Sequence, residues 1–405
     1  MRIIVIGGGA SGVIAAIHAK NEKNEVMILE RNDRLLKKLL ITGNGRCNYL
    51  HESYTPDDYH SQNKEYLEDF LCEKNIDDVR FFFDSIGIIS KNRNGYIYPF
   101  SNQATTVRDA LIREIDKKGI NVQYNAYVSM IRKTNNQFFV RTENRDYYCD
   151  KLILATGSYA YPKTGSDGSG YAFLKQFGHN IINPVPALVQ LVSNFPYCAE
   201  WDGVRCDVEL TLLENQEEIA SEEGEIQLTD YGISGICTFN LSQYVSRGLD
   251  ENKKEVIQIN FVPFIETLIT PWMDRYSKKN LDKNLYELLE GFLNKKIIPI
   301  ILKCSHLRED VSYEDLTNDE KISLCRNLKE LPIEITGTKD FDNCQVCNGG
   351  VSLHDIHMDT MESKLVDGLY ITGELLDING NCGGFNLTEC WISGILAGRN
   401  LRDIG

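Results

Sequence analysis

Positive charge is scarce in this chain of 405 residues. Its 43 Lys and Arg residues stand against 58 Asp and Glu residues, which gives a formal net charge of −15 at pH 7. A surface with this excess of carboxylates repels phosphate backbones and anionic lipid headgroups. We therefore expect neither a nucleic acid nor a membrane among the partners of the chain.

Long apolar runs and export signals are also missing. No apolar stretch reaches the roughly 18–20 residues of a transmembrane helix, and the N-terminus carries neither a basic segment nor a small-residue cleavage site. The twelve cysteines therefore indicate reduced thiols rather than disulfides. We expect a cytoplasmic protein, and its length suits two or three domains.

Clusters for metal or hydrolytic chemistry are missing as well. No Ser-His-Asp arrangement competes for the active site, and no metal site is expected. Cys344 and Cys347 form a CxxC pair, but no second pair and no His pair follow at zinc-ligand spacing. Such spacing can lower a thiol pKa and support redox chemistry. Because this pair lies in an apparent strand and not at a helix start, we interpret it as buried, inert thiols, with a redox role as the alternative.

The first thirty residues, by contrast, carry a strong pattern. The apolar run Arg2–Ile6 leads into the motif GGGASG, and an Ala-rich helical stretch and a second apolar run ending at Glu30 follow. Gly7 allows a tight turn, Gly9 lets the backbone approach a pyrophosphate, and Gly12 lets the helix pack on the strand. The helix N-terminus offers N–H groups to the phosphates, and Glu30 lies where a carboxylate accepts ribose hydroxyls. The pattern predicts a dinucleotide site.

Later segments of the chain also contain residues that suit a bound cofactor. The loop 37–48 combines small residues, amides and a guanidinium, which suits phosphates or a cofactor ring. The apolar strand 151–154 ends in Ala-Thr-Gly, and a strand over 369–372 ends in Gly-Glu. Because such folds bind ligands at the carboxyl edge of the sheet, we expect both strand ends at the site. A final helix over 387–401 could stabilise negative charge on a reduced ring.

The middle of the chain has a different pattern. Runs that alternate with period two predict half-buried antiparallel strands, and we interpret the acid-rich segment 214–225 as the solvated connection between two of them. Residues 266–331 indicate helices, with a capping box at Thr317–Glu320. Before this region, the segments 122–131, 138–142 and 146–149 predict a small antiparallel meander.

These residues together resemble the FAD-binding flavoprotein oxidoreductases. More narrowly, the chain is similar to the HI0933-like flavoproteins, often labelled NAD(P)/FAD-dependent oxidoreductases or the aminoacetone oxidase family. The resemblance covers nearly the whole chain and is carried further by TGNGRCN at 42–48, by residues 96–107, by TDYGISG at 229–235 and by TMESK at 360–364. The GRCN and MESK motifs are specific to few other families.

The resemblance implies an α/β protein with a Rossmann-like FAD-binding domain and an inserted β-barrel and helical domain. The FAD-binding domain would comprise residues 1–188 and 335–405. The inserted barrel would span 189–265, and the inserted helical domain 266–334.

The resemblance also implies which residues hold FAD. Those implied for the pyrophosphate are Gly7, Gly9, Ala10, Ser11 and Gly12. Those implied for the adenosine side are Glu30, Val128, Ala155, Thr156 and Gly157. Those implied for the ribityl chain and phosphate are Gly373, Glu374 and Asp377. Those implied for the flavin side are Arg46, Cys47, Asn48, Gly384, Phe385, Asn386 and Leu387. Further expected contacts to FAD are Arg31, Lys38, Thr42 and Gly45.

Some residues depart from the family pattern. Phe385 stands where Tyr is usual and Thr388 where Gln is usual, both near the expected ring, and Ile236 replaces a Pro. Cys344 and Cys347 occupy positions where the pattern usually has no cysteine. Substrate preference is therefore less well determined than flavin binding.

The reaction follows from the cofactor. Flavin chemistry passes a hydride through N5, while the protein supplies orientation and proton transfer. The glycines of 165–170 do not follow an apolar strand, so we expect NAD(P)H only as a transient reductant that docks over the flavin. Family members are linked to reduction of conjugated double bonds in 3-oxo bile acids and to oxidation of a small amino ketone.

Three functions follow from these observations. We favour an FAD-dependent reductase of a conjugated or keto small molecule, with an amine or amino-ketone oxidase and a non-catalytic flavin-binding protein as the alternatives. A hydride delivered to an enone needs a proton donor at the adjacent carbon. We assign this role to Tyr161, whereas we interpret His354 as a loop histidine.

Overall fold

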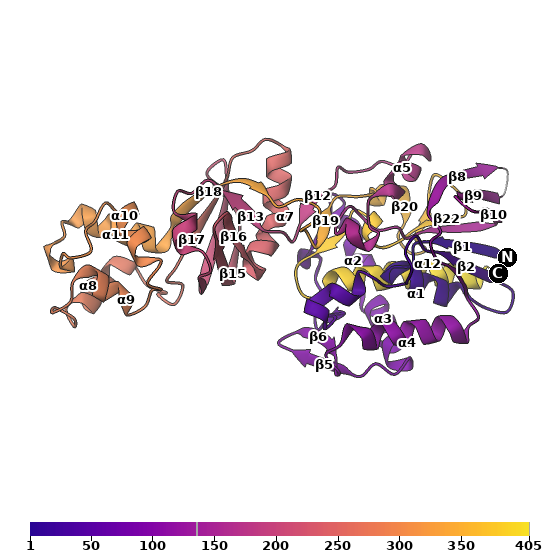
Figure 1. Ribbon diagram of the computed structural model, residues 1–405, viewed down its shortest axis with the longest axis horizontal. Coiled ribbons are helices and arrows are strands. Elements are labelled where there is room, and N and C mark those ends of the chain that lie inside the picture. Colours follow the sequence, from indigo (N-terminus) through magenta and orange to yellow (C-terminus); the bar gives the residue numbers. More distant parts are fainter. Residues whose placement is uncertain (135–136, 405) are drawn as a thin grey trace. The chain divides into compact units, whose positions relative to one another are not determined.

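The computed structural model describes residues 1–134 and 137–404, and it divides the chain into two compact units (Figure 1). One unit comprises Met1–Val185 together with the chain from Cys344 onward, and the other comprises Pro186–Asn343. Each unit has its own hydrophobic core. Among the described residues, no helix combines the length and the apolar character that a membrane crossing needs.

A sheet with the order β20-β21-β22-β11-β1-β2-β7 forms the centre of the first unit, as far as the chain is described. Strands β7, β2, β1, β11 and β22 run parallel, and β21 and β20 add an antiparallel edge. The bounds of these strands are β1 Arg2–Ile6, β2 Glu25–Leu29, β7 Asn121–Gln123, β11 Lys151–Leu154, β20 Ile356–His357, β21 Glu362–Ser363 and β22 Leu369–Ile371. Most side chains of the central strands β2, β1, β11 and β22 are buried, as expected for parallel strands covered on both faces, whereas no residue of the edge strand β7 is buried.

Two helices, α1 (Ala10–Ala19) and α12 (Phe385–Asp403), lie side by side in this unit (Figure 1). Gly394 and Gly398 allow the close approach, because a Cβ at these positions would lie 2.6 Å from the carbonyl oxygen of Ser11 and 2.5 Å from that of Ala15. Helix α1 follows the end of β1 through the turn Gly7–Gly9, whereas α12 starts after Gly384, which lies against Leu50 and Asn48.

Smaller elements complete the first unit. The helices are α2 Leu67–Phe70, α3 Glu73–Ser85, α4 Ala104–Lys117 and α5 Ser169–Gln176. The strands are β3 Leu50–His51, β4 Tyr59–His60, β5 Ser90–Arg93, β6 Tyr96–Pro99, β8 Val128–Thr134, β9 Gln137–Thr142, β10 Asp146–Cys149, β19 Val346–Asn348 and β23 Asn379–Gly380. Strand β12 (Val185–Ala187) starts at the last residue of the first stretch and has its other two residues in the second unit. Strands β8, β9 and β10 form the predicted antiparallel meander. The prediction of one strand over 122–131 is wrong, because the chain leaves β7 after Gln123 and starts β8 only at Val128.

A closed barrel with the order β13-β16-β15-β14-β17-β18 forms one part of the second unit. Its strands are β13 Leu191–Ser193, β14 Arg205–Glu214, β15 Glu217–Thr229, β16 Gly232–Gly235, β17 Glu255–Asn260 and β18 Leu331–Thr338. Buried and exposed residues alternate along β14 and β18, so that one face of each strand fills the interior. The interpretation of 214–225 as a connection is wrong: most of its acidic residues belong to β15 and pair across to β14.

The helices of the second unit pack into the same core as the barrel. Their bounds are α6 Cys198–Trp201, α7 Ile236–Asp250, α8 Ile269–Ser277, α9 Leu285–Glu290, α10 Ile298–Cys304 and α11 Asn318–Lys329. The predicted capping box is confirmed, since Thr317 accepts from the Glu320 N–H and the Glu320 carboxylate accepts from the Thr317 N–H. The division between a barrel domain and a helical domain at residue 265 stays a prediction.

Candidate functional site

The glycine turn after β1 has two kinds of glycine. A Cβ at Gly7 (φ 106°) would lie 2.2 Å from the carbonyl oxygen of Ala155, and one at Gly12 would lie 2.0 Å from that of Gly7. At Gly9, in contrast, no atom of the described residues lies within 4 Å of the Cβ position. Internal packing therefore requires Gly7 and Gly12, whereas Gly9 leaves open space for a ligand.

Helix α1 starts directly behind this open space. It begins at Ala10, and within the described chain no side chain caps its N-terminus. The first N–H groups of a helix have no partner inside the helix, and they carry partial positive charge. The turn is thus built to accept an anion such as a pyrophosphate.

Glu30 lies against this turn. Its Oε2 accepts a hydrogen bond from the Gly8 N–H at 2.7 Å, and its Oε1 accepts one from the Asn32 N–H at 2.7 Å. The Ala126 N–H donates to the Glu30 carbonyl at 2.9 Å, which brings the segment before Val128 alongside. The Asn32 Nδ2 also donates to Oε1 at 2.7 Å, so Oε2 is the oxygen that keeps a lone pair for a ribose hydroxyl. Glu30 and the segment that leads to Val128, far apart in the sequence, thus lie side by side.

Arg31 is held at the same edge. Its guanidinium lies 5.0 Å from the centre of the Tyr127 ring and forms an ion pair with Asp167. Gly157, in the loop that precedes Asp167, has φ 76°, and a Cβ there would lie 2.4 Å from the Ser166 Oγ. The loop after β11 therefore packs tightly on itself while Asp167 reaches Arg31.

Lys38 and Glu374 form an ion pair inside the site. The Lys38 Nζ lies 2.8 Å from both carboxylate oxygens of Glu374, and the Ser158 Oγ donates to Glu374 Oε2 at 3.0 Å. Burial lowers the pKa of Lys38, but the charge and hydrogen bonds of Glu374 outweigh it and raise that pKa above its ordinary value. Lys38 therefore stays charged. The sequence reasoning missed Ser158, whose one signal is its position directly after Ala-Thr-Gly.

The loop 42–48 meets the start of α12. Gly43 and Cys47 have left-handed backbones (φ 55° and 58°), which fold the loop back on itself. Gly384, directly before α12, has φ 97°, and a Cβ there would lie 2.4 Å from the Leu50 carbonyl oxygen and 2.9 Å from the Asn48 Oδ1. The sequence-predicted residues of loop and helix are thus brought together. No side chain of the described residues caps α12 either.

Two polar atoms at these positions have no partner in the described chain. The Asn48 Oδ1 and the Thr156 Oγ1 are both buried and both lack a hydrogen bond. Buried polar groups are almost always bonded, because an unsatisfied one costs about 1–3 kcal/mol. Together with the open cradle at Gly9, they show that the residues present fit a polar, phosphate-bearing cofactor.

The side chains of Phe385 and Asn386 make contacts with other residues of the protein. Phe385 stacks on His51 with ring centroids 4.5 Å apart and meets the edge of Tyr54 at 5.8 Å. Asn386 accepts from the Gly380 N–H at 2.8 Å and donates to the Gly380 carbonyl at 2.8 Å. Leu387 is half-buried beside them. These residues therefore offer a ligand their backbone N–H groups, not their side-chain polar atoms.

Asp377 and Gly373 tie the end of β22 to other segments. The Asp377 Oδ2 accepts from the Gln62 N–H at 2.7 Å and from the Ser61 Oγ at 3.1 Å. A Cβ at Gly373 (φ 68°) would lie 2.4 Å from the Ser11 Oγ, so this glycine packs on the first turn of α1. No sequence pattern marked Ser61 and Gln62.

The remaining predicted residues differ in their surroundings. The Thr42 Oγ1 donates to the Leu39 carbonyl at 2.7 Å, Gly45 is exposed, and the Arg46 Nε donates to the Gly43 carbonyl at 3.2 Å. Burial raises the pKa of the Cys47 thiol to about 12, so it stays protonated.

Tyr161 and His354 lie in different settings. Tyr161 is half-buried and has φ 59°. His354 is exposed, bonds the Tyr66 hydroxyl at 2.9 Å and lies 3.7 Å from Glu65. None of the described contacts of His354 involves a residue that is predicted to bind FAD.

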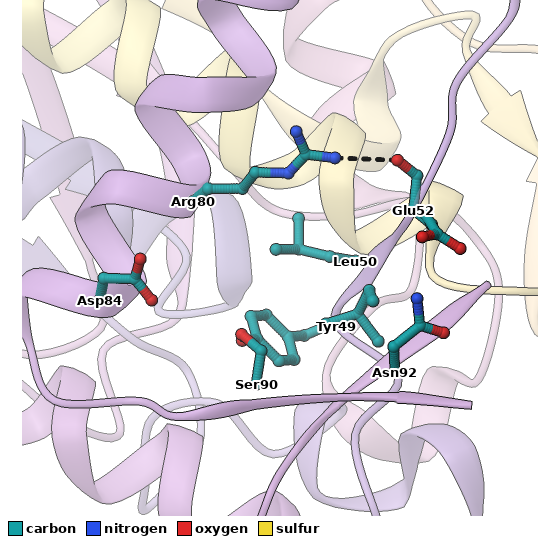
Figure 2. A pocket seen from close by; sticks show the side chains of 8 residues that line it. Tyr49, Leu50, Glu52, Arg80, Asp84, Ser90 and Asn92 are labelled. Atoms are coloured by element: carbon teal, nitrogen blue, oxygen red, sulfur yellow. Dashed lines mark hydrogen bonds between the residues drawn. The ribbon is translucent and has the colours of Figure 1, made fainter. Parts of the chain in front are cut away.

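A separate pocket has a volume of about 230 Å³. Tyr49, Leu50 and Arg80 are among the residues that line it (Figure 2). The Arg80 Nη2 donates to the Glu52 carbonyl at 2.9 Å across its rim. No residue predicted to bind FAD lines it, and ligand pockets usually reach about 300 Å³ or more. The candidate site is therefore the cradle between α1, Glu30, the Lys38–Glu374 pair and the start of α12.

Fold and cradle define a Rossmann-type FAD-binding oxidoreductase. The model of the family described as the HI0933-like protein Rossmann domain matches residues 1–400, and the chain belongs to this family.

Two relatives match almost the whole chain, and one solved structure shares its fold. The 3-dehydro-bile acid delta(4,6)-reductase of Clostridium scindens is 39% identical over 98% of this chain and 98% of its own. The ribosomal RNA dihydrouridine synthase of Escherichia coli is 25% identical over 96% of this chain and 95% of its own. The solved 3-ketosteroid-delta4-(5alpha)-dehydrogenase from Rhodococcus jostii RHA1 shares the fold, with a TM-score of 0.51, 13% identity and coverage of 99% and 96%.

Proposed function

We propose that this chain is an FAD-dependent reductase that uses NADH or NADPH to reduce a conjugated or keto small molecule, with a steroid- or bile-acid-like enone as the substrate class. The substrate class follows from the reductase of Clostridium scindens, which is 39% identical over almost the whole length of both chains. The observation that carries the proposal is the open space at Gly9, directly before the N-terminus of α1.

The proposed roles follow from the charges of the cradle. Bound FAD supplies hydride transfer through its N5 atom. The N–H groups at Gly9–Gly12 bind the pyrophosphate, and Glu30 orients the adenosine ribose. The N–H groups at the start of α12 stabilise negative charge on the reduced ring. The Lys38–Glu374 pair holds the loop 37–48 against the end of β22 and fixes the cradle around the cofactor.

Tyr161 is the proposed proton donor. Its left-handed backbone (φ 59°) is unfavourable for a Tyr by about 1–2 kcal/mol, and strain of this kind concentrates at functional sites. The Thr164 N–H and Oγ1 donate to its carbonyl at 2.9 and 2.8 Å and hold that conformation. Within the described chain its hydroxyl has no hydrogen-bond partner, so it is available to a substrate.

A second candidate function is uridine reduction in RNA. It is supported by the Escherichia coli relative, a ribosomal RNA dihydrouridine synthase. The net charge of −15 opposes it, because RNA binding depends on positive charge along the phosphate path. The small-molecule reductase is therefore the better-supported function.

An anaerobic spectral titration tests the proposal. We expect flavin bands near ~370 and ~450 nm that bleach on addition of NADH or NADPH and return on addition of a 3-oxo-4-ene steroid or bile acid. Bands that resist both nucleotides but bleach with an amine and recover with oxygen would indicate an oxidase. Bleaching by a nucleotide, with recovery on uridine-containing RNA and not on any enone, would support the second candidate.

A further inference from the structure

Cys344 and Cys347 lie together in the interior of the first unit. Their exposed fractions are 0% and 5%, and both are thiols in this structure. The Cys347 thiol lies within hydrogen-bond reach of the Cys344 thiol. A CxxC spacing places two sulfurs where a disulfide closes with little movement of the backbone, as in redox-active dithiols.

The pair is connected to the cofactor cradle. The Cys347 thiol also lies within hydrogen-bond reach of Ser158, whose Oγ donates to Glu374 at 3.0 Å. Glu374 in turn binds Lys38. A chain of contacts therefore runs from the dithiol to residues expected beside the ribityl chain of FAD.

The backbone after Cys347 fixes this arrangement. The Val351 N–H donates to the Leu375 carbonyl at 2.8 Å, and the Asp377 N–H donates to the Val351 carbonyl at 2.9 Å. A Cβ at Gly350 would lie 2.6 Å from the Leu375 carbonyl oxygen. The CxxC segment is thus pinned to the strand end that carries Glu374.

Cys347 differs electrostatically from other buried cysteines. Burial raises the pKa of Cys149 to about 12 and that of Cys390 well above its ordinary value. Burial also raises the pKa of Cys347, but its hydrogen bonds to Cys344 and Ser158 and the charge of Lys38 lower it more than burial and Glu374 raise it. Lowered thiol pKa values are typical of reactive cysteines.

We propose that Cys344 and Cys347 are a redox-active dithiol that exchanges two electrons with the FAD bound by the same unit. When the two S–H bonds break and the S–S bond forms, two electrons and two protons leave the cysteines and are accepted by oxidised FAD. In the reverse direction the S–S bond breaks, and reduced FAD supplies the same two electrons and two protons. The inference rests on FAD binding in the proposed function but not on the reduction of an enone.

Peptide mapping and an anaerobic reductive titration test the inference on the holoprotein. After treatment with the thiol oxidant diamide and blocking of thiols, we expect mass spectrometry to find a disulfide within the peptide that carries both cysteines. Dithionite should then deliver about four electrons per flavin to the wild type and about two to Cys347→Ser. Cys344→Ser serves as a second variant, should the first fold poorly.

The control variant is Cys149→Ser, which removes an equally buried thiol of the same unit and should keep the value of about four electrons. A wild type that forms no disulfide, or that accepts only about two electrons after oxidation, overturns the inference. If the wild type takes up about four electrons per flavin but does not reduce an enone, only the proposed function is contradicted. If it reduces an enone but takes up only about two electrons per flavin, only the redox role of the dithiol is contradicted.

Discussion

The Lys38 Nζ and the Glu374 carboxylate lie 2.8 Å apart, although 336 positions separate the two residues in the chain. Their side chains are only 24% and 18% exposed, so water screens the pair weakly. Through this contact the loop after β2 is fastened to the end of β22. A cradle for one cofactor is thereby assembled from the two ends of the chain.

The first prediction concerns this ion pair. Glu374→Gln should lower the free energy of unfolding by about 3 kcal/mol, because it leaves the Lys38 charge buried without its counter-ion. It should also lower the flavin content, which absorbance measures, while urea unfolding gives the stability. The control, Asp146→Asn, removes an exposed partner of Arg141 and should change neither quantity. Equal behaviour of both variants would show that the buried pair has no special role.

Gly9 and Gly12 allow a matched comparison. Gly12→Ala should destabilise the first unit by about 1–3 kcal/mol, since its Cβ would overlap the Gly7 carbonyl. Gly9→Ala should keep the stability, because its Cβ meets open space, yet weaken FAD binding by crowding the pyrophosphate. Thermal unfolding of the FAD-free proteins and titration with FAD separate the two effects. A Gly9→Ala variant that binds FAD normally would contradict the cradle.

Tyr161→Phe should slow only one half of the reaction. Flavin reduction by NADH or NADPH should keep its rate, whereas reoxidation by the enone should slow by about 100-fold, because the proton at the adjacent carbon is no longer donated. Stopped-flow absorbance at the flavin band measures both rates. A variant that slows both halves equally, or neither, would remove Tyr161 from the proton-transfer step.

The buried carboxyl group of Glu389 should make the stability of the protein depend on pH. Burial, together with the Glu374 charge, raises its pKa from 4.5 to about 8, although hydrogen bonds from Cys390 and Ser393 oppose this. Between these two values the folded state binds more protons than the unfolded state, so stability should fall as the pH rises from about 4.5 to about 8. Urea midpoints across this range should decline less in Glu389→Gln than in the wild type. Parallel declines would indicate that Glu389 does not titrate in this way.

Local signals predicted the elements of this protein well. The strand–GGGASG–helix order produces β1, the turn and α1, since glycine freedom and helical periodicity act within a few residues. The Thr317 capping box is local in the same sense. Errors arose where neighbours along the chain gave the wrong signal: acidic residues around Glu222 suggested a loop, but pairing with β14 holds them in a strand.

The sequence by itself therefore determined the class of protein and the order of strand, glycine turn and helix at its start, while the assigned FAD contacts and domain bounds stay predictions. The tertiary structure alone decided which distant groups meet. Ser158 beside Glu374, Gln62 on Asp377 and the side chain of Asn386 turned onto Gly380 follow no sequence spacing. The physical reason is that turns and helices depend on interactions within a few residues, whereas hydrogen bonds across the fold depend on the packing of the whole core.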